Sequence, residues 1–304
     1  MNPPNPLRAL WKTPGPWIGD GPMGTELLRM GWSPGEHGPS HLWNRTHPDL
    51  VRAVHSQWAA IGAQLHRTNT FTLLPSLAFG SKVEQADAGE LVARGIELAR
   101  DAAPGGLVVV ALGPVAPNVY PPTCPVSPGL SEALSRADGI LLETWSHPHV
   151  VEWSQWIRPN PEFPLILSGC FRSGTNLARN PKGLSPEPAG DGGLIQGGPI
   201  MGSFMETLGG HSPEIWADWA DRAKADMIGF NCGWEWTQEM LEELIERFGR
   251  IWPGPLWCFP GPGILPGLKW KIWERYMLGG CCDVRVADLV KIQRMASLKC
   301  STKS

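Results

Sequence analysis

The chain alternates short apolar runs with longer segments in which apolar residues recur every three or four positions. The longer segments have the period of a helix that packs one face on a core, and the short runs are typical of strands buried on both faces. We predict strands over residues 16–21, 64–71, 107–114, 139–145, 163–171, 226–232, 255–261 and 277–282. We predict helices over residues 47–63, 82–103, 127–137, 147–157, 212–225, 237–249, 267–276 and 286–299.

Capping residues mark the ends of two predicted helices. Ser212 precedes "PEIWADWADRAKA" and is expected to be its N-cap, because a serine hydroxyl accepts a hydrogen bond from the free amides of a first helical turn. Thr237 has the same position before "QEMLEELIERF". Gly249 follows that segment and is the predicted end of the helix.

The order of these elements predicts one domain. Eight strand–helix alternations without an obvious linker between two halves are the pattern of a (β/α)8, or TIM, barrel. We therefore expect residues 1–304 to form a single α/β barrel domain; an open doubly wound sheet is the alternative. The stretch from Phe171 to Gly210 is rich in Gly and Pro and lacks periodicity, so we expect an extended loop after the fifth strand.

Composition narrows the partners and the compartment. The net charge is −3 and the charges are scattered, without a basic stripe that would favour nucleic acid or an anionic membrane. We find no secretory signal and no apolar run near the roughly 20 residues that span a bilayer. Seven cysteines, an odd number, favour thiols in a reducing compartment over a disulfide framework. The prediction is a cytoplasmic protein that binds small molecules.

Polar residues cluster where the predicted strands end. In a barrel these ends converge on one face, where catalysis takes place in nearly every characterised case. Three thiols from two strand ends, Cys232 with Cys281 and Cys282, therefore suit a catalytic zinc whose fourth position stays open. The full set of clusters is Asp20-Gly21, Thr68-Asn69-Thr70, Glu143-Thr144, Asn231-Cys232 and Cys281-Cys282.

The two adjacent cysteines raise a question of backbone geometry. Neighbouring side chains on a strand point to opposite faces, so a shared site for Cys281 and Cys282 needs an irregular backbone. Gly279 and Gly280 come directly before them. We expect these glycines to supply the irregularity, because glycine adopts backbone angles that other residues avoid.

Five motifs, in this order, resemble those of one enzyme family. The stretches "DGPMGTELLRMG", "HRTNTF", "ILLETWS", "IGFNCG" and "GGCC" are similar to motifs of the zinc-dependent homocysteine S-methyltransferases. That family includes betaine– and S-methylmethionine–homocysteine methyltransferases and the homocysteine half of cobalamin-dependent methionine synthase. The resemblance covers nearly the whole chain, and "GGCC" with an upstream "NC" is its most specific part. The family fold is a (β/α)8 barrel, as the alternation of elements predicts.

The resemblance implies a metal centre made of three cysteines. Cys232, Cys281 and Cys282 are implied as zinc ligands and catalytic residues. Asn231 matches the asparagine of the family's "NC" motif, and we expect its amide to orient the ligands or the substrate. Three thiolates leave a zinc complex negatively charged, which keeps a bound sulfur nucleophilic.

The resemblance also implies a site for the amino acid part of homocysteine. Asp20, Gly21, Thr68 and Glu143 match the family positions that hold it, and we assign Asn69 to the same substrate-binding group. Two carboxylates suit an α-ammonium group, and a threonine hydroxyl with glycine N–H groups suits an α-carboxylate. The implied reaction is nucleophilic substitution by the thiol on a methyl carried by a cationic sulfur or nitrogen, or by cobalt, with methionine as the product.

The donor is the least defined part of the prediction. The family usually continues "GGCC" with Gly-Thr, whereas Asp283 and Val284 follow here, and several loops that help to define the donor pocket differ. Two alternatives stay open. One is the same barrel acting on another thiol or donor, and the other is a non-catalytic barrel in which zinc or free thiols serve structure or redox sensing.

Individual residues also have structural alternatives. Each of the three cysteines can be an apolar core residue, Asp20 a helix cap, Glu143 part of an ion pair, and Thr68 and Asn69 strand-end hydrogen bonders.

Four other cysteines and the aromatic residues complete the prediction. Cys170 and Cys258 lie near strand ends, and a fourth sulfur from either would make the zinc structural; Cys124 and Cys300 are expected to have no ligand role. The histidines show no ligand spacing and are assigned surface or core roles. We hypothesise that Trp234 or Trp236 contacts a cationic donor. The other Trp-rich helices indicate core packing or an oligomer face, so a homo-oligomer is an open alternative.

Overall fold

The computed structural model describes residues 5–78, 82–122, 126–173, 205–232, 236–263 and 274–300. Its main sheet has eight short, buried strands. In most repeats, the segment that leads to the next strand carries at least one helix. These strands are β1 (Trp17–Ile18), β2 (Leu65–Arg67), β3 (Leu107–Leu112), β4 (Gly139–Trp145), β5 (Leu165–Gly169), β8 (Met227–Asn231), β9 (Leu256–Phe259) and β10 (Tyr276–Leu278).

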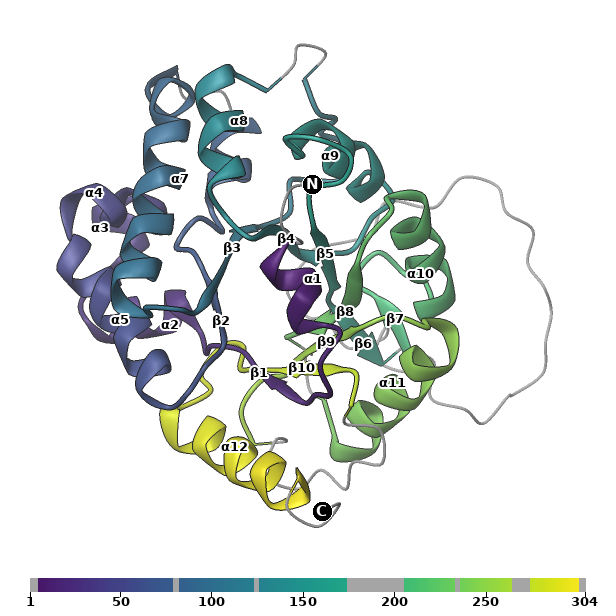
Figure 1. Ribbon diagram of the computed structural model, residues 1–304. Coiled ribbons are helices and arrows are strands. Elements are labelled where there is room, and N and C mark those ends of the chain that lie inside the picture. The colour runs from purple at the N-terminus through teal and green to yellow at the C-terminus, as the bar shows by residue number, and fades with distance from the viewer. Residues whose placement is uncertain are drawn as a thin grey trace.

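The eight strands close into a barrel. All neighbouring pairs are parallel, in the order β1-β10-β9-β8-β5-β4-β3-β2. A further parallel bridge pairs Gly19, just beyond β1, with Leu65 in β2, so the first and last strands of this order meet. The predicted single (β/α)8 architecture is confirmed (Figure 1).

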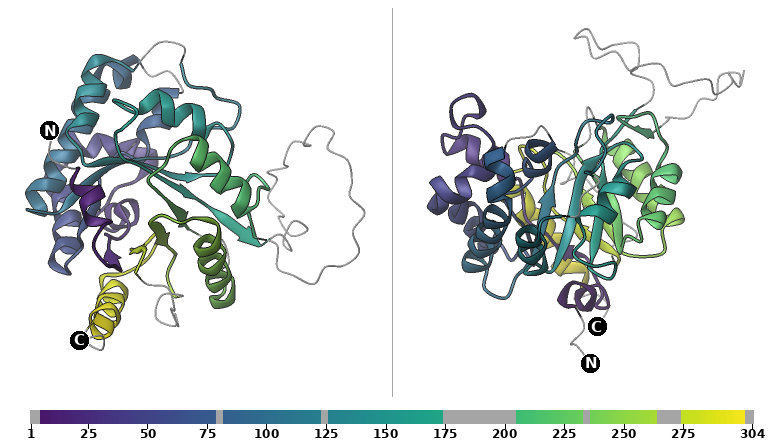
Figure 2. Two further views of the ribbon diagram at one scale, coloured as in Figure 1. Left: turned by 45° about the vertical axis from the view of Figure 1, so that its right-hand side comes forward. Right: turned by 90° about the horizontal axis from the view of Figure 1, so that it is seen from above.

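Helices surround the strands on the outside (Figure 2). One short helix, α1 (Pro6–Leu10), instead lies across the centre of the ring of strands (Figure 1). The outer elements are α2 (Met23–Arg29), α3 (Pro34–His37), the 3-10 helix η1 (Ser40–Leu42), α4 (Trp43–Thr46), α5 (Pro48–Ala60), α6 (Leu73–Ala78), α7 (Lys82–Ala102), α8 (Pro128–Ser135), α9 (Val150–Ile157), α10 (Pro213–Arg222), α11 (Gln238–Ile251) and α12 (Val286–Cys300).

Both predicted N-caps are confirmed, and one predicted helix end is wrong. The side chains of Ser212 and Thr237 each accept a hydrogen bond from the backbone amide three residues on. Helix α11 continues through Gly249 and ends at Ile251. The next residue has extended backbone angles (φ −122°, ψ 120°), as the residue before a proline requires, and Pro253 follows it. The proline therefore ends this helix, and the glycine does not.

The predicted loop after the fifth strand begins and ends in a small antiparallel pair. Strand β6 (Phe171–Ser173) pairs with β7 (Met205–Thr207), and the two lie apart from the barrel sheet. The intervening residues 174–204 lie outside the described residues, as does most of the predicted helix over 267–276.

The core has two layers. The larger cluster lies between the strands and the outer helices and includes Trp153 of α9 and Trp216 and Trp219 of α10, all buried. These tryptophans support the core-packing alternative over an oligomer face. The smaller cluster fills the barrel interior, where the rings of Trp257 and Phe259 stack with centroids 3.8 Å apart.

Among the described helices, none combines the length and the apolar character that spanning a bilayer requires.

Helix α1 closes the amino-terminal end of the barrel interior. Its Leu7 is fully buried and belongs to the interior cluster. Asn5 caps the helix, since its side chain accepts from the Leu7 and Arg8 amides, and it also donates to the carbonyl of Asp138 before β4. The contact with Gly139 is close: a side chain there would meet Leu7 at 2.9 Å. The chain before the first strand is therefore part of the barrel core.

Replacing Leu7 with alanine should destabilise the fold. The change leaves a cavity in the closed end of the barrel, so we expect Leu7→Ala to lower the free energy of unfolding by about 2–4 kcal/mol in urea denaturation. Leu28→Ala is the matched control, because Leu28 on α2 is 49% exposed. An equally small loss for both variants would show that α1 does not close the barrel.

Candidate active site

The structure brings three cysteine sulfurs together at the carboxyl ends of the strands. Cys232 directly follows β8, and Cys281 and Cys282 lie in the turn after β10. The Cys282 Sγ lies 3.3 Å from the Cys232 Sγ and 3.9 Å from the Cys281 Sγ. Cys232 and Cys281 are joined in a disulfide, with Cα atoms 5.7 Å apart. Residues far apart in sequence thus meet in one sulfur cluster.

The disulfide corrects the prediction of free thiols. Two thiols aimed at one point are close enough to pair by oxidation, and sequence spacing does not reveal such proximity. The three positions still fit a metal. Zinc–sulfur bonds of about 2.3 Å in a tetrahedral site place ligand sulfurs roughly 3.8 Å apart, which is near both distances of the Cys282 Sγ. Reduction of the one bond restores three donors.

Neither neighbouring cysteine adds a fourth sulfur. Cys170 donates its thiol hydrogen to the Cys232 carbonyl, and burial raises the pKa of the Cys170 thiol to about 12. Cys258 is fully buried in the outer core, and burial raises its pKa as well. Cys124 lies outside the described residues. Among the described side chains, the ligand group that includes Cys282 contains the three cysteines alone.

The backbone around the cluster adopts left-handed conformations. The φ angle is +43° at Cys232, +69° at Thr144 and +62° at Asp283. Such angles are uncommon for residues other than glycine and are held in place by the surrounding structure. Each of these residues lies at or just after a strand end of the site. They turn the chain sharply where the sulfurs and Glu143 have to be placed.

Gly279 and Gly280 are required for space and not for unusual backbone angles, which corrects the prediction. Neither has a positive φ. A side chain at Gly279 would lie 2.1 Å from a ring carbon of Phe259 and 2.6 Å from the Asp20 carbonyl oxygen. One at Gly280 would lie 2.5 Å from Val284. The glycines let the turn after β10 approach β9 and β1 closely. This approach places both following cysteines at the rim formed by the carboxyl ends of the barrel strands.

Asn231 connects the sulfur cluster to the neighbouring strands. Its Oδ1 accepts from the Ser168 hydroxyl at 2.5 Å and from the Thr144 amide at 3.2 Å. Its Nδ2 donates to the Thr144 hydroxyl at 2.8 Å and lies 3.7 Å from the Cys281 Sγ. The amide is fully occupied and points one N–H at a sulfur. These contacts fit the expected orienting role.

Arg67, the last residue of β2, lies between the carboxylates of Asp20 and Glu143. Its Nε donates to Asp20 at 2.7 Å and its Nη1 to Glu143 at 2.5 Å. Its Nη2 donates to the carbonyls of Gly21 and Gly280, each at 2.9 Å. The side chains of Arg67, Asp20 and Glu143 are at most 8% exposed. The two carboxylates expected to face a substrate ammonium therefore face a guanidinium of the protein.

This guanidinium stays charged in spite of its burial. Burial disfavours the charge on Arg67, but attraction by Asp20 and Glu143 outweighs it and raises the pKa of the guanidinium. The Phe259 ring lies beneath it, with the centroid 4.6 Å from Cζ. Sequence reasoning missed Arg67. The signal was available, because Arg67 is two residues from Leu65 and side chains two apart on a strand share a face.

Thr68 and Asn69 make hydrogen bonds within the protein. The Thr68 hydroxyl lies 2.6 Å from that of Thr70 and accepts from the Ala111 amide at 3.3 Å. The Asn69 Nδ2 donates to the Ser40 carbonyl at 2.7 Å. Both side chains thus have the strand-end role that was the structural alternative, and a substrate role for them stays a prediction.

The chain also matches a known family over most of its length. Residues 17–296 match the family described as homocysteine S-methyltransferase. This chain belongs to that family. The resemblance drawn from its motifs is confirmed.

This homocysteine S-methyltransferase family member is similar to a curated protein and to solved structures. The Escherichia coli (strain K12) homocysteine S-methyltransferase is 31% identical over 106 residues, which are 34% of this chain and about a third (33%) of that relative's length. The E. coli homocysteine methyltransferase MmuM has been solved in metallated and oxidised forms, with TM-scores of 0.69 and 0.67 at 21% identity. Each match covers 96% of this chain and 100% of that chain. These structures share the fold.

A second group of potential ligands in this family member lies under the rim. One ligand atom each of Asp20, His55 on α5 and His66 on β2 lie within 4.8 Å of one another. Burial lowers the pKa of His66 and, together with His66 and Arg67, lowers that of His55 to about 3, so both rings are neutral at neutral pH. Arg67 already bonds Asp20 and would repel a cation here. The histidines have the predicted core role.

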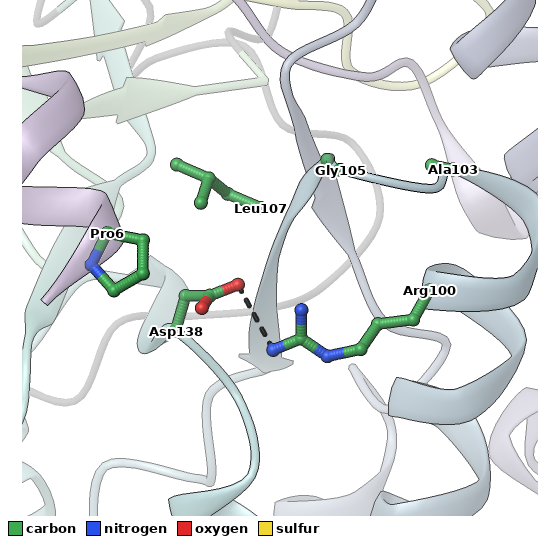
Figure 3. A pocket seen from close by; sticks show the side chains of 7 residues that line it. Pro6, Arg100, Ala103, Gly105, Leu107 and Asp138 are labelled. Atoms are coloured by element: carbon green, nitrogen blue, oxygen red, sulfur yellow. Dashed lines mark hydrogen bonds and ion pairs between the residues drawn. The ribbon is translucent and has the colours of Figure 1, made fainter.

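A hollow at the amino-terminal end of the barrel is separate from the sulfur cluster. It is lined by Pro6, Arg100, Gly105, Leu107 and Asp138, among others (Figure 3). The Arg100 Nη2 lies 3.2 Å from the Asp138 Oδ2, and this carboxylate also accepts the amide of the residue after Leu107. The charges in the hollow are paired with each other at the starts of β3 and β4. The residues that line this hollow include no cysteine, unlike those at the opposite end of the barrel.

Trp236 is packed in the outer core, so the hypothesis of a tryptophan against the methyl donor rests on Trp234. The Trp236 Nε1 donates to the Phe171 carbonyl at 2.9 Å, and its ring packs on Phe230 in the outer core. Only 8% of the residue is exposed. Trp234, the other tryptophan of the hypothesis, lies outside the described residues.

His55→Leu should weaken the pH dependence of stability. The His55 pKa is about 3 in the fold against 6.5 for a free imidazole, so between these values only the unfolded chain binds the proton. Wild-type stability therefore falls as the pH falls through this window. The variant cannot bind this proton, so its free energy of unfolding should depend on pH less steeply, by up to about 1.4 kcal/mol per pH unit.

Urea denaturation between about pH 4 and pH 6 measures this slope. His37→Leu removes an exposed imidazole and is the matched control, which we expect to follow the wild type. Identical slopes for the wild type and His55→Leu would contradict the burial of a neutral His55.

Proposed function

We propose that this protein is a zinc-dependent S-methyltransferase that moves a methyl group from a cationic or cobalamin-type donor to the thiol of homocysteine, giving methionine. The observation that carries the proposal is the meeting of three cysteine sulfurs, from the ends of β8 and β10, within 4.8 Å. Family membership supports methyl transfer to homocysteine. The metallated form of the E. coli homocysteine methyltransferase MmuM, which shares the fold, supports a metal.

The donor set supports zinc as that metal. Cys232, Cys281 and Cys282 would hold it once the disulfide is reduced, and thiolates are ligands that zinc prefers. A zinc ion held by these three side chains would lower the pKa of the acceptor thiol, so that the acceptor would react as a thiolate at neutral pH. Asn231 holds the strand ends around the cluster and directs one N–H at the Cys281 Sγ.

The transfer itself is a substitution at carbon. The acceptor thiol releases its proton to solvent, and its sulfur forms a bond to the methyl carbon while the bond from that carbon to the donor's sulfur, nitrogen or cobalt breaks. The electron pair leaves with the donor, which neutralises a cationic donor. The protein's task is to hold the acceptor sulfur and the methyl carbon in line and to exclude water.

The acceptor's amino acid part is proposed to lie beside the sulfurs at the rim. Asp20 and Glu143 support this placement through Arg67, which also bonds the Gly280 carbonyl next to Cys281. The Gly21 carbonyl accepts a hydrogen bond from the same guanidinium. Thr68 and Asn69 are assigned to this region as the residues that shape the end of β2.

Zinc content tests the metal site. The reduced protein should hold about one zinc per chain, and Cys281→Ala should lose most of it, because two thiolates bind zinc far more weakly than three. Cys258→Ala is the matched control, since Cys258 is buried away from the cluster. Metal analysis after dialysis, with circular dichroism to confirm folding, measures both. Equal zinc in both variants would place the metal elsewhere.

Activity tests the reaction and identifies the donor. Homocysteine is paired in turn with S-methylmethionine, S-adenosylmethionine, betaine and methylcobalamin, and methionine is measured by mass spectrometry. We expect methionine from at least one pair with the zinc-loaded wild type, and none from Cys281→Ala. A zinc-loaded protein that forms methionine from no donor would favour the non-catalytic barrel. Methylation of a different thiol alone would favour the other acceptor.

The oxidation state of the cluster bears on where the protein works. Cys232 and Cys281 can bind zinc only as thiols, and thiols persist in reducing compartments. We therefore place the active protein in the cytoplasm.

A further inference from the structure

The proposed acceptor site already contains a cation of its own. The Arg67 guanidinium makes four hydrogen bonds, to one oxygen each of Asp20 and Glu143 and to the carbonyls of Gly21 and Gly280. The Arg67 backbone amide also donates to the second Asp20 oxygen at 2.7 Å. Both Asp20 oxygens are therefore occupied before any substrate enters.

We propose that Arg67 determines the specificity for the acceptor. Its guanidinium takes the place of a substrate α-ammonium between Asp20 and Glu143. The pocket therefore accepts a thiol of the length of homocysteine whether or not it carries an amino group. This inference rests on the proposed function and concerns the same site.

An incoming ammonium cannot displace the guanidinium cheaply. The four side-chain bonds are made by a charged donor, and such bonds are about twice as strong as neutral ones. Their loss would leave the charge of Arg67 unpaired in a buried site, where breaking one ion pair is strongly destabilising. The Phe259 ring packs against the guanidinium and is itself stacked on Trp257 in the barrel interior. The substrate must therefore bind with Arg67 in place.

Little attraction for an ammonium then remains. One guanidinium lies between the two carboxylates and offsets the charge of one of them, and burial raises the pKa of Glu143. The Glu143 Oε2 is the one carboxylate oxygen of the pair without a hydrogen bond to a described residue. An ammonium gains one partner there, whereas an empty pair of carboxylates would offer it several.

The test compares two thiols that differ by the amino group. Zinc-loaded, reduced protein is titrated with homocysteine and with 4-sulfanylbutanoate, its deaminated analogue, in a calorimeter, so that no methyl donor is needed. We expect the two dissociation constants to agree within about tenfold, whereas a pocket built to bind the ammonium would reject the analogue by about 10⁴-fold.

Three variants separate the charge of Arg67 from its packing. Arg67→Met exposes two uncompensated carboxylates, so its preference for homocysteine over the analogue should rise about tenfold or more over the wild type. Arg67→Lys keeps the charge and should retain the weak preference. Arg8→Met is the matched control, because Arg8 pairs with Asp226 at the other end of the barrel, with an Nε–Oδ1 distance of 2.7 Å. Its preference should equal that of the wild type.

Each outcome decides between the inference and the function on which it rests. Binding of homocysteine alone by the wild type would overturn the inference and leave the proposed function intact. Binding of neither thiol to the zinc-loaded protein would overturn both. An unchanged preference in a folded Arg67→Met would also overturn the inference. If Arg67→Met does not fold, the wild-type comparison and Arg67→Lys still decide.

Discussion

The sulfur cluster depends on two successive carbonyl groups at the end of β9. The carbonyl of Phe259 accepts the Cys232 amide at 3.2 Å, and the carbonyl of Pro260 accepts the Cys281 amide at 3.0 Å. Strand β9 lies between β8 and β10, so it holds a cysteine-bearing turn on each side. The absence of a side chain at Gly279 lets one turn approach. The sulfurs converge because the backbone beneath them is fixed.

The charges at the rim extend this constraint around the barrel. One guanidinium, that of Arg67 in β2, bonds Asp20 after β1, Glu143 in β4 and the Gly280 carbonyl after β10. A buried ion group of this kind contributes little net stability, because desolvation offsets the attraction. Its effect is to hold four strand ends in register beside the sulfurs. The buried charged group and the two cysteine-bearing turns therefore share one rigid support.

The fold and the cluster of cysteines could be predicted from the sequence, and the details of the rim could not. The barrel follows from apolar runs alternating with helical periods, and parallel strands bring Cys232 and Cys281 to one end. Alternation also places Arg67 on the interior face with Leu65, but only coordinates show the carboxylates that it bonds. The disulfide of Cys232 and Cys281 depends on a close approach that spacing does not encode.

Gly249 and α1 show the same limit in local structure. A glycine after an amphipathic run is typical of a helix end, yet the extended backbone imposed by Pro253 sets the end of α11 two residues later. Helix α1 is too short to show a period, and its burial follows from Leu7 filling the barrel interior. Local signals decide where packing is weak, and tertiary contacts override them where it is strong.

The two ends of the barrel have different roles. The amino-terminal end stabilises the fold, and the carboxyl end carries the candidate site. At the amino-terminal end, Leu7 closes the interior and the charges of Arg100 and Asp138 neutralise each other. At the carboxyl end, Thr144 and Cys232 hold left-handed backbone angles beside a buried charged group. Conformations of this kind persist only where the surrounding structure over-determines them. The packed core below and the helices outside supply that support, so the rim can hold three sulfurs and an arginine in positions that an isolated chain would not adopt.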